Sequence, residues 1–243
     1  MKVLFCSRPD LMTVYGGDTV QVLQTKRSLE ALGVTIDIQH EQYPDVRGYD
    51  LVHIFNTQFA YFGSKQLAHV KSRGCPVALS TIYWDMRSAL ESRDFLRYEI
   101  RASVRPFLWR TPRLSARLLR EGRDVLTGYH SKIAGMLRAA DVLLPNSVAE
   151  LEILVHEFDY PMARGKSFIV ANAVRQMSAS AAPLSEKAQR ALDRLPDKFV
   201  MEAARIESVK GQRPKPRTTA RWCPNIRVVF LGGHRAYNQY WHR

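Results

Sequence analysis

The stretch that decides the fold is KVLFC at residues 2–6, followed by GGDTVQVLQTKRSLEALGVTIDI at residues 16–38. A short apolar run is followed by a helical pattern over residues 18–32 and by a β-branched run over residues 35–39. Gly33 comes directly after the helical pattern, where a left-handed cap ends many helices. The stretch therefore predicts one strand, helix, strand unit.

The same alternation continues along the chain. Four further apolar runs predict strands, and two helical patterns lie among them: the strands at Asp50–Phe55, Pro76–Ser80, Val142–Pro145 and Phe168–Ala171, and the helices before Gly74 and at Val148–Phe158. Ser147 precedes the last helix as an N-cap, with Glu150 at the capping-box spacing. Strands that are apolar on both faces and joined by helical crossovers predict an α/β fold, a Rossmann-like doubly wound parallel sheet with an incomplete second domain.

A change in composition indicates the domain boundary. Residues 177–197 are rich in Ser, Ala, Pro and mixed charge, and strand-like sequence resumes at residue 198. We therefore expect a first domain at residues 1–176, a linker at residues 177–197, and the start of a second domain at residues 198–243. The two strands expected in that last part are too few for a core of their own, so we expect the second domain to be truncated.

Charge and cysteine content limit the possible classes of protein. The net charge is +13. Residues 86–138 hold 12 Lys and Arg against 5 acidic residues, and residues 203–243 hold 9 against 1. On charge alone, nucleic acid, anionic lipid and phosphorylated substrates are all possible partners. Three distant cysteines indicate neither a disulfide framework nor a thiolate metal site, and no run of about 18 apolar residues predicts a membrane-spanning helix.

Several polar and aromatic residues and one glycine could line the edge at the carboxyl ends of the predicted strands, where open α/β sheets bind ligands. They are Gly16, His53, Asn56, Tyr83, Asp85, Asn146 and Asn172. The pair Gly16 and Gly17 opens the first helix, where backbone N–H groups and the helix dipole favour a phosphate. The pair fits neither a dinucleotide fingerprint nor a P-loop, and a plain tight turn is the alternative interpretation.

Five segments in order resemble family 4 glycosyltransferases. GGDTVQVLQTKRSLEALGVTIDI resembles their glycine loop, first helix and second strand, and DLVHIFN at residues 50–56 resembles a strand ending near an acceptor-side His. ADVLLPNSVAELEIL at residues 140–154 resembles the strand and helix that close the first sheet. SFIVANAV at residues 167–174 resembles the family's segment "V-x-x-N-G-V", with Ala173 in place of the Gly. AARIESVKGQ at residues 203–212 resembles the family's donor-phosphate element "G-R-x-x-x-x-K-G", with Ala204 in place of the first Gly.

The resemblance implies a GT-B architecture and a retaining transfer of sugar from a nucleotide-sugar donor to a glycan or lipid-linked acceptor. It implies that Arg205 and Lys210 act as catalytic cations, because fixed positive groups stabilise a departing diphosphate without a metal or other cofactor. Gly16 and Gly17 would bind the donor with them. The acceptor side would comprise His53, Asn56 and Asp85.

Two of these assignments have alternatives. A buried hydrogen bond in the core is the other interpretation of His53. Trp84 precedes Asp85 where the family shows a His-Asp pair, which puts the usual active-site His in doubt. Tyr83 and Trp84 could stack on a sugar or simply pack.

A basic helical pattern holds Arg93, Arg97, Arg101 and Arg105, four residues apart, with apolar residues between them. It predicts a solvated helix face or a surface that binds anionic membranes. A non-catalytic Rossmann-like fragment that binds a membrane or a partner through this pattern is the alternative function. Nucleic acid is not expected, because no nucleic-acid-binding motif accompanies the pattern. A cytoplasmic location, peripheral on the inner face of the membrane, follows from the leading interpretation.

The last part of the chain departs from the family. RPKPRTTARWC at residues 213–223 is rich in Pro and Arg where the family carries an amphipathic helix, which indicates either an out-of-frame patch or a basic loop. The family's pair of glutamates seven residues apart, which grips the donor, is also missing. We therefore expect this chain alone to transfer sugar weakly or not at all.

Overall fold

The chain divides into two units. The computed structural model describes residues 1–84, 128–172, 185–204, 219, 221 and 223–232. The described residues up to Asn172 belong to the first unit, and those from Ser185 onward belong to the second.

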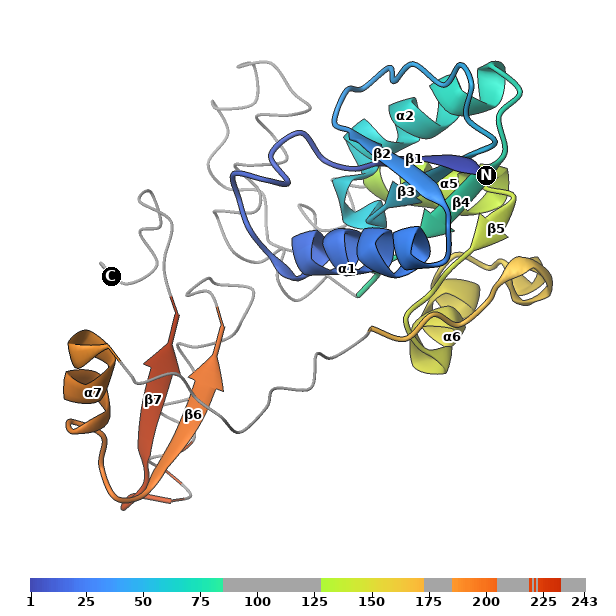
Figure 1. Ribbon diagram of the computed structural model, residues 1–243. Helices are drawn as coiled ribbons and strands as arrows, with labels where there is room; N and C mark the ends of the chain where they lie inside the picture. The colour runs from blue at the N-terminus through green and yellow to red at the C-terminus, as the bar shows by residue number, and fades with distance from the viewer. Residues whose placement is uncertain (85–127, 173–184, 205–218, 220, 222, 233–243) are drawn as a thin grey trace, which may run out of the picture. The chain divides into compact units, whose positions relative to one another are not determined.

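The first unit contains a five-stranded parallel sheet in the order β2-β1-β3-β4-β5 (Figure 1). Its strands are β1 (Lys2–Cys6), β2 (Thr35–Gln39), β3 (Leu51–Phe55), β4 (Val77–Ser80) and β5 (Val142–Leu143). Its α-helices are α1 (Gly17–Ala31), α2 (Ala60–Ser72), α5 (Tyr129–Ala139) and α6 (Val148–Glu157). Two short 3-10 helices are η1 (Thr57–Phe59) and η4 (Pro161–Lys166).

Alternate residues of the central strands enter two separate cores. On β1, Leu4 and Cys6 pack in a cluster with residues of α2, α5 and α6, while Val3 and Phe5 pack in a second cluster with Val22 of α1. The helices thus cover both faces of the sheet, α1 on one side and α2 with α5 on the other (Figure 1). Burial on both faces explains why the strands are apolar throughout. The predicted Rossmann-like α/β fold class is confirmed.

The strand predicted around Phe168–Ala171 is wrong. Ser167 forms one isolated bridge with Leu143, and the amides of Phe168 and Val170 each donate one hydrogen bond, to the carbonyls of Leu143 and Pro145 at 2.9 Å. The segment is extended and largely exposed, but residues 167–172 form no strand. β5 also ends earlier than predicted. The Leu144 amide still donates to the Leu79 carbonyl at 2.8 Å, but the Asn146 amide donates to the Glu150 side chain at 2.7 Å and so leaves the ladder with β4.

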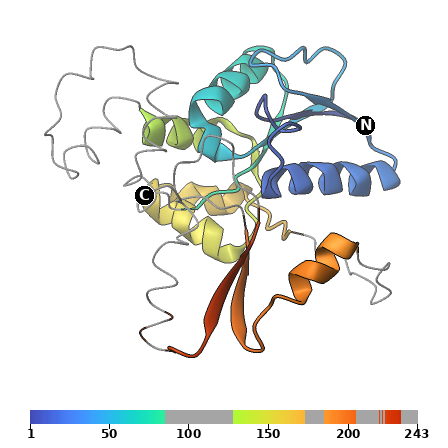
Figure 2. The same cartoon turned by 90° about the vertical axis from the view of Figure 1, so that its left-hand side faces the viewer.

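In the second unit, the structure describes one helix and a parallel pair of strands (Figure 2). These are α7 (Glu186–Leu192), β6 (Phe199–Ala203) and β7 (Arg227–Leu231). The helix lies within residues 177–197, the predicted linker. The predicted boundary between residues 176 and 177 lies outside the described residues and stays a prediction.

Across the described ranges of both units, no helix combines the length and the apolar character that crossing a bilayer requires.

Candidate functional site at the carboxyl edge of the sheet

The order of the strands places a topological switch point between β1 and β3. From β1 the chain moves to β2 on one side, while β3, β4 and β5 follow on the other. The helix after β1 covers one face of the sheet, and the helix after β3 covers the opposite face. In open α/β sheets, ligands bind at such a point, beyond the carboxyl ends of the two strands. The residues that follow Cys6 and Phe55 therefore form the candidate site.

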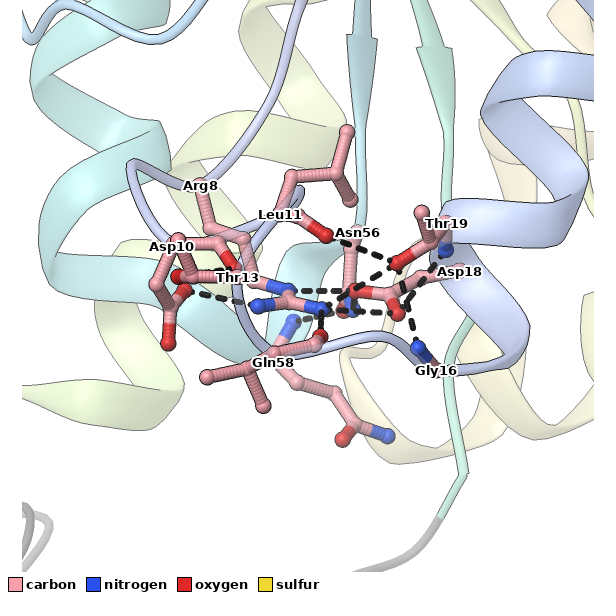
Figure 3. A network of polar contacts seen from close by, with 10 residues as sticks. Arg8, Asp10, Leu11, Thr13, Gly16, Asp18, Thr19, Asn56 and Gln58 are labelled. Carbon is pink, nitrogen blue, oxygen red and sulfur yellow. Dashed lines mark hydrogen bonds and ion pairs between the residues drawn. The ribbon is translucent and has the colours of Figure 1, made fainter.

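A buried arginine lies at the centre of this site (Figure 3). The side chain of Arg8, two residues after β1, is only 4% exposed. Its Nε donates to Asp18 Oδ2 at 2.7 Å, its Nη1 donates to Asp10 Oδ1 at 2.7 Å, and its Nη2 donates to the Val14 carbonyl at 2.6 Å. The guanidinium also lies 5.5 Å from the centre of the Phe59 ring. These contacts tie the loop after β1 to the first turn of α1.

The ion pair between Arg8 and Asp18 shifts the pKa of each group in the direction that keeps the group charged. Burial lowers the pKa of the Arg8 guanidinium, but hydrogen bonds to Asp18 and Asp10 outweigh burial and raise that pKa above its ordinary value. Burial likewise raises the pKa of Asp18, but the hydrogen bond and charge of Arg8 lower it overall. The pair is therefore ionised at neutral pH. One guanidinium here faces two aspartates.

The glycine turn forms the start of α1. Gly16 is the N-cap in an extended conformation, and its amide donates to Thr19 Oγ1 at 3.1 Å. That hydroxyl donates in turn to the Leu11 carbonyl at 3.0 Å. Among the described residues, nothing accepts a hydrogen bond from the amides of Gly17 and Asp18. These two amides lie at the positive end of the helix dipole, the arrangement that binds anions.

Asn56 connects the end of β3 to this turn. Its backbone has a φ of 76°, in the left-handed region that Asn adopts more readily than most residues. Its side-chain oxygen accepts from the Gln58 amide at 2.9 Å, and its Nδ2 donates to Asp18 Oδ2 at 3.4 Å. Figure 3 shows Asn56, Asp18 and Arg8 in one continuous network. Two predicted site residues, Gly16 and Asn56, are therefore brought together.

A second buried carboxylate braces the ends of β4 and β5. Glu150 is 7% exposed. Its Oε1 accepts from the Thr81 hydroxyl and from the Tyr83 amide at 2.7 Å, and its Oε2 accepts from the Asn146 amide at 2.7 Å. Ser147 Oγ accepts from the Glu150 amide at 3.1 Å, which confirms the predicted N-cap of α6. This carboxylate fixes two loops at the carboxyl edge.

Asn146 also contacts α1 from the far side of the edge. Gln21 Nε2 donates to Asn146 Oδ1 at 2.9 Å, across 125 residues of sequence. The loops after β1 and β5 are thus held through α1.

His53 lies in the core. Its ring stacks on Phe55 with centroids 3.9 Å apart and meets the edge of Phe5 at 5.1 Å. Its Nε2 lies 2.8 Å from Ser80 Oγ. Burial lowers the pKa of His53 to about 3, so the ring is neutral at physiological pH. These contacts match the interpretation of His53 as a core residue with a satisfied hydrogen bond.

The remaining predicted residues are dispersed or undescribed. Tyr83 is buried, whereas Trp84 and Asn172 are exposed. The predicted residues outside the described ranges are Asp85, Arg93, Arg97, Arg101, Arg105, Arg205 and Lys210, together with most of residues 213–223. Their roles stay predictions. Among the described residues, no group of three or more His, Cys, Asp or Glu side chains could hold a metal ion.

Sequence reasoning missed three residues that organise the edge. Arg8, Asp18 and Glu150 are charged residues whose side chains are largely buried. The sequence holds a partial signal for Arg8, because an arginine two residues after a buried strand and two residues before Asp10 can be held inside only when it is paired.

Comparisons with known proteins give matches among solved structures only. No protein-family model matches the chain, and no curated protein matches it. Among solved structures, a UGT transferase from Siraitia grosvenorii in complex with UDP matches with 12% sequence identity and a TM-score of 0.48. The match covers 95% of this chain and 62% of that chain, so the present chain spans less than two thirds of the transferase.

Proposed function

We propose that this chain is part of a retaining, family 4 type glycosyltransferase that uses a nucleotide-sugar donor and a glycan or lipid-linked acceptor. The observation that carries the proposal is the position of the glycine turn. Gly16 and Gly17 follow β1 at the switch point between β1 and β3 and open α1 there. A turn without side chains, at a helix N-terminus and at this point of the sheet, suits a phosphate-bearing ligand.

The local geometry supports a close approach of ligand to backbone. A Cβ added at Gly17 would meet nothing within 4 Å, and the residue is exposed. The fold itself therefore does not require glycine at this position. Absence of a side chain where packing does not demand it is the pattern expected when a ligand approaches the main chain.

The chemistry assigned to the remaining parts follows the resemblance. Arg205 and Lys210 would stabilise the departing diphosphate, which is the group that carries the negative charge released in transfer. Asn56 and Asp85 would face the acceptor, whereas the ring contacts and hydrogen bond of His53 favour its interpretation as a core residue. The resemblance to the family places all five matched segments in order along the chain, which supports transferase chemistry over other uses of this fold.

The test compares two glycine substitutions in the full chain. Gly17→Ala adds a methyl group at the turn, and Gly135→Ala adds one on the exposed side of α5, where a Cβ would also meet nothing within 4 Å. We expect Gly17→Ala to weaken the binding of UDP and of UDP- or GDP-sugars, measured by calorimetry, by about tenfold, or about 1.4 kcal/mol. Gly135→Ala should bind like the unaltered chain.

Transfer of radiolabelled sugar to membrane lipid extracts tests the reaction itself. The proposal fails if the unaltered chain binds none of these nucleotides and the two glycine variants behave alike. Binding to anionic vesicles without nucleotide binding would favour the non-catalytic alternative.

A further inference from the structure

Arg8 uses its hydrogen-bonding groups entirely within the protein. All three guanidinium nitrogens donate to described groups: Nε and Nη2 to Asp18, Nη1 to Asp10, and Nη2 also to the Val14 carbonyl. With 4% of its side chain exposed, the guanidinium is not available to a ligand as a direct contact. Any part that it plays at the switch point must act through the residues it holds.

The charge of Asp18 creates a problem that Arg8 resolves. Asp18 is the acidic residue in the first turn of α1, next to the two amides that have no acceptor. A carboxylate at this place repels a second anion and competes with it for the helix dipole. The Arg8 guanidinium spans both oxygens of this carboxylate, with Nε–Oδ2 at 2.7 Å and Nη2–Oδ1 at 3.2 Å. Such a paired contact offsets the charge of the carboxylate, whose Oδ1 also accepts from the Thr19 amide at 3.0 Å.

The same guanidinium fixes the shape of the turn. Its bond to the Val14 carbonyl, 2.6 Å long, holds the main chain two residues before the N-cap Gly16. A longer contact of 3.5 Å reaches Thr19 Oγ1, the acceptor for the Gly16 amide. Both ends of the glycine turn are therefore anchored to one side chain.

We propose that Arg8 is a positioning residue for an anionic, diphosphate-bearing ligand: it holds the glycine turn in place and neutralises Asp18, so that the Gly17 and Asp18 amides can receive the anion. This role rests on the proposed function for the identity of the ligand. The role goes beyond the proposed function because Arg8 would raise the affinity for the anion without contacting the anion.

The pair of residues allows an electrostatic role to be separated from a purely structural one. Arg8→Gln removes the cation and leaves the Asp18 carboxylate uncompensated. Asp18→Asn breaks the same ion pair but removes the repelling charge. A purely structural role predicts that both variants lose affinity. The proposed role predicts that Arg8→Gln loses affinity and Asp18→Asn does not, with the double variant recovering part of what Arg8→Gln loses.

The experiment measures the binding of UDP and of uridine to the full chain by calorimetry. We expect Arg8→Gln to bind UDP at least about tenfold more weakly and uridine almost unchanged, because uridine lacks the charged group. Asp18→Asn should bind UDP as tightly as the unaltered chain or more tightly. The matched control is Arg47→Gln, which removes an exposed arginine that is also paired with an aspartate, Asp45, at 2.7 Å. This control should bind UDP normally.

A second measurement needs no ligand. Hydrogen exchange of the peptide spanning residues 9–19 should be faster in Arg8→Gln than in the unaltered chain, while peptides from β3 and β4 keep their protection. Unchanged exchange at the turn overturns the positioning role whatever the ligand is. Equal loss of UDP and uridine binding, or equal loss in Arg8→Gln and Asp18→Asn, overturns the electrostatic role.

The two proposals fail in different ways. If the unaltered chain binds no UDP, the proposed function and the ligand part of this role both fall, and the exchange measurement alone decides whether Arg8 holds the turn.

Discussion

The buried carboxylate of Glu150 offers a quantitative test of how the carboxyl edge is held together. Glu150→Ala removes the acceptor from the Tyr83 and Asn146 amides and from the Thr81 hydroxyl. A buried amide left without its acceptor costs about 1–3 kcal/mol, and the loss of an acidic residue from the first turn of a helix adds about 0.3–1 kcal/mol. Two such amides and the helix-terminal charge together should lower the free energy of unfolding of the first unit by about 2–7 kcal/mol in Glu150→Ala.

The isosteric variant should lose less stability than Glu150→Ala. Glu150→Gln keeps one oxygen but turns an NH₂ group toward the other donors, so that one of the two amides still loses its acceptor. We expect a loss of about 1–3 kcal/mol. The matched control is Glu152→Ala on the same helix, whose side chain is 42% exposed and pairs with Arg164 at 2.6 Å. An exposed pair of this kind contributes at most about 1 kcal/mol.

Urea unfolding of all three variants provides the assay, with hydrogen exchange of β1 and β3 peptides reporting on the first unit separately. The described units can unfold in separate steps, so a signal from the whole chain would mix them. If Glu150→Ala and Glu152→Ala destabilise the first unit equally, the brace formed by the buried carboxylate has no energetic importance and the reasoning is refuted.

Three further predictions follow from single residues. Because burial lowers the pKa of His53 to about 3, the unfolded chain binds an extra proton below about pH 6.5; stability is full above that pH and falls by about 1.4 kcal/mol per unit toward pH 4. His53→Leu should reduce this slope in acid unfolding titrations, and an unchanged slope would contradict the assignment. Cys223 is exposed, while burial raises the pKa of Cys6 to about 12; a thiol reagent should modify Cys223 rapidly in the native chain and Cys6 only after unfolding. Gly33 has a φ of +83°, so Gly33→Ala should lower the unfolding free energy by about 1 kcal/mol, whereas Gly135→Ala inside α5 should raise it by about 0.5–1 kcal/mol; calorimetric melting showing equal effects would contradict this.

The sequence predicts the first half of the sheet closely, because local signals and tertiary structure agree there. The strand at Thr35–Gln39 has the predicted bounds, and the predicted helix at residues 18–32 is displaced by one residue. Gly33 adopts the left-handed conformation expected of a cap. The apolar periodicity and the position of Gly33 both predict the same helix, so each signal supports the other.

The second half is predicted less well because its geometry depends on long-range contacts. The apolar side chains of residues 168–170 predict a strand. The neighbouring edge contains Pro145, which has no backbone N–H, so it offers too few hydrogen-bond donors for a further strand. β-branched and aromatic residues indicate a preference for extended backbone and cannot show whether a paired neighbour exists.

The site shows the same division. Gly16 and Asn56 are predictable because their types and their positions after strands indicate a ligand edge. The ion pair between Arg8 and Asp18 is not, because the residues are ten positions apart and meet only when the loop folds back. His53 lies inside β3, three residues before Asn56, and the packing of Phe5 and Phe55 around its ring buries it.

The brace between Thr81 and Glu150 also sets an order of events during synthesis. Its two halves are separated by 69 residues. At about 5–20 residues per second, a ribosome delivers the glutamate about 3–14 s after the threonine. Throughout that interval the newly made β4 has no carboxylate to receive its loop amide, and for most of it β5 has not been made. The growing chain therefore exposes an unpaired strand edge, and a chaperone that shields such edges would act on it in this window.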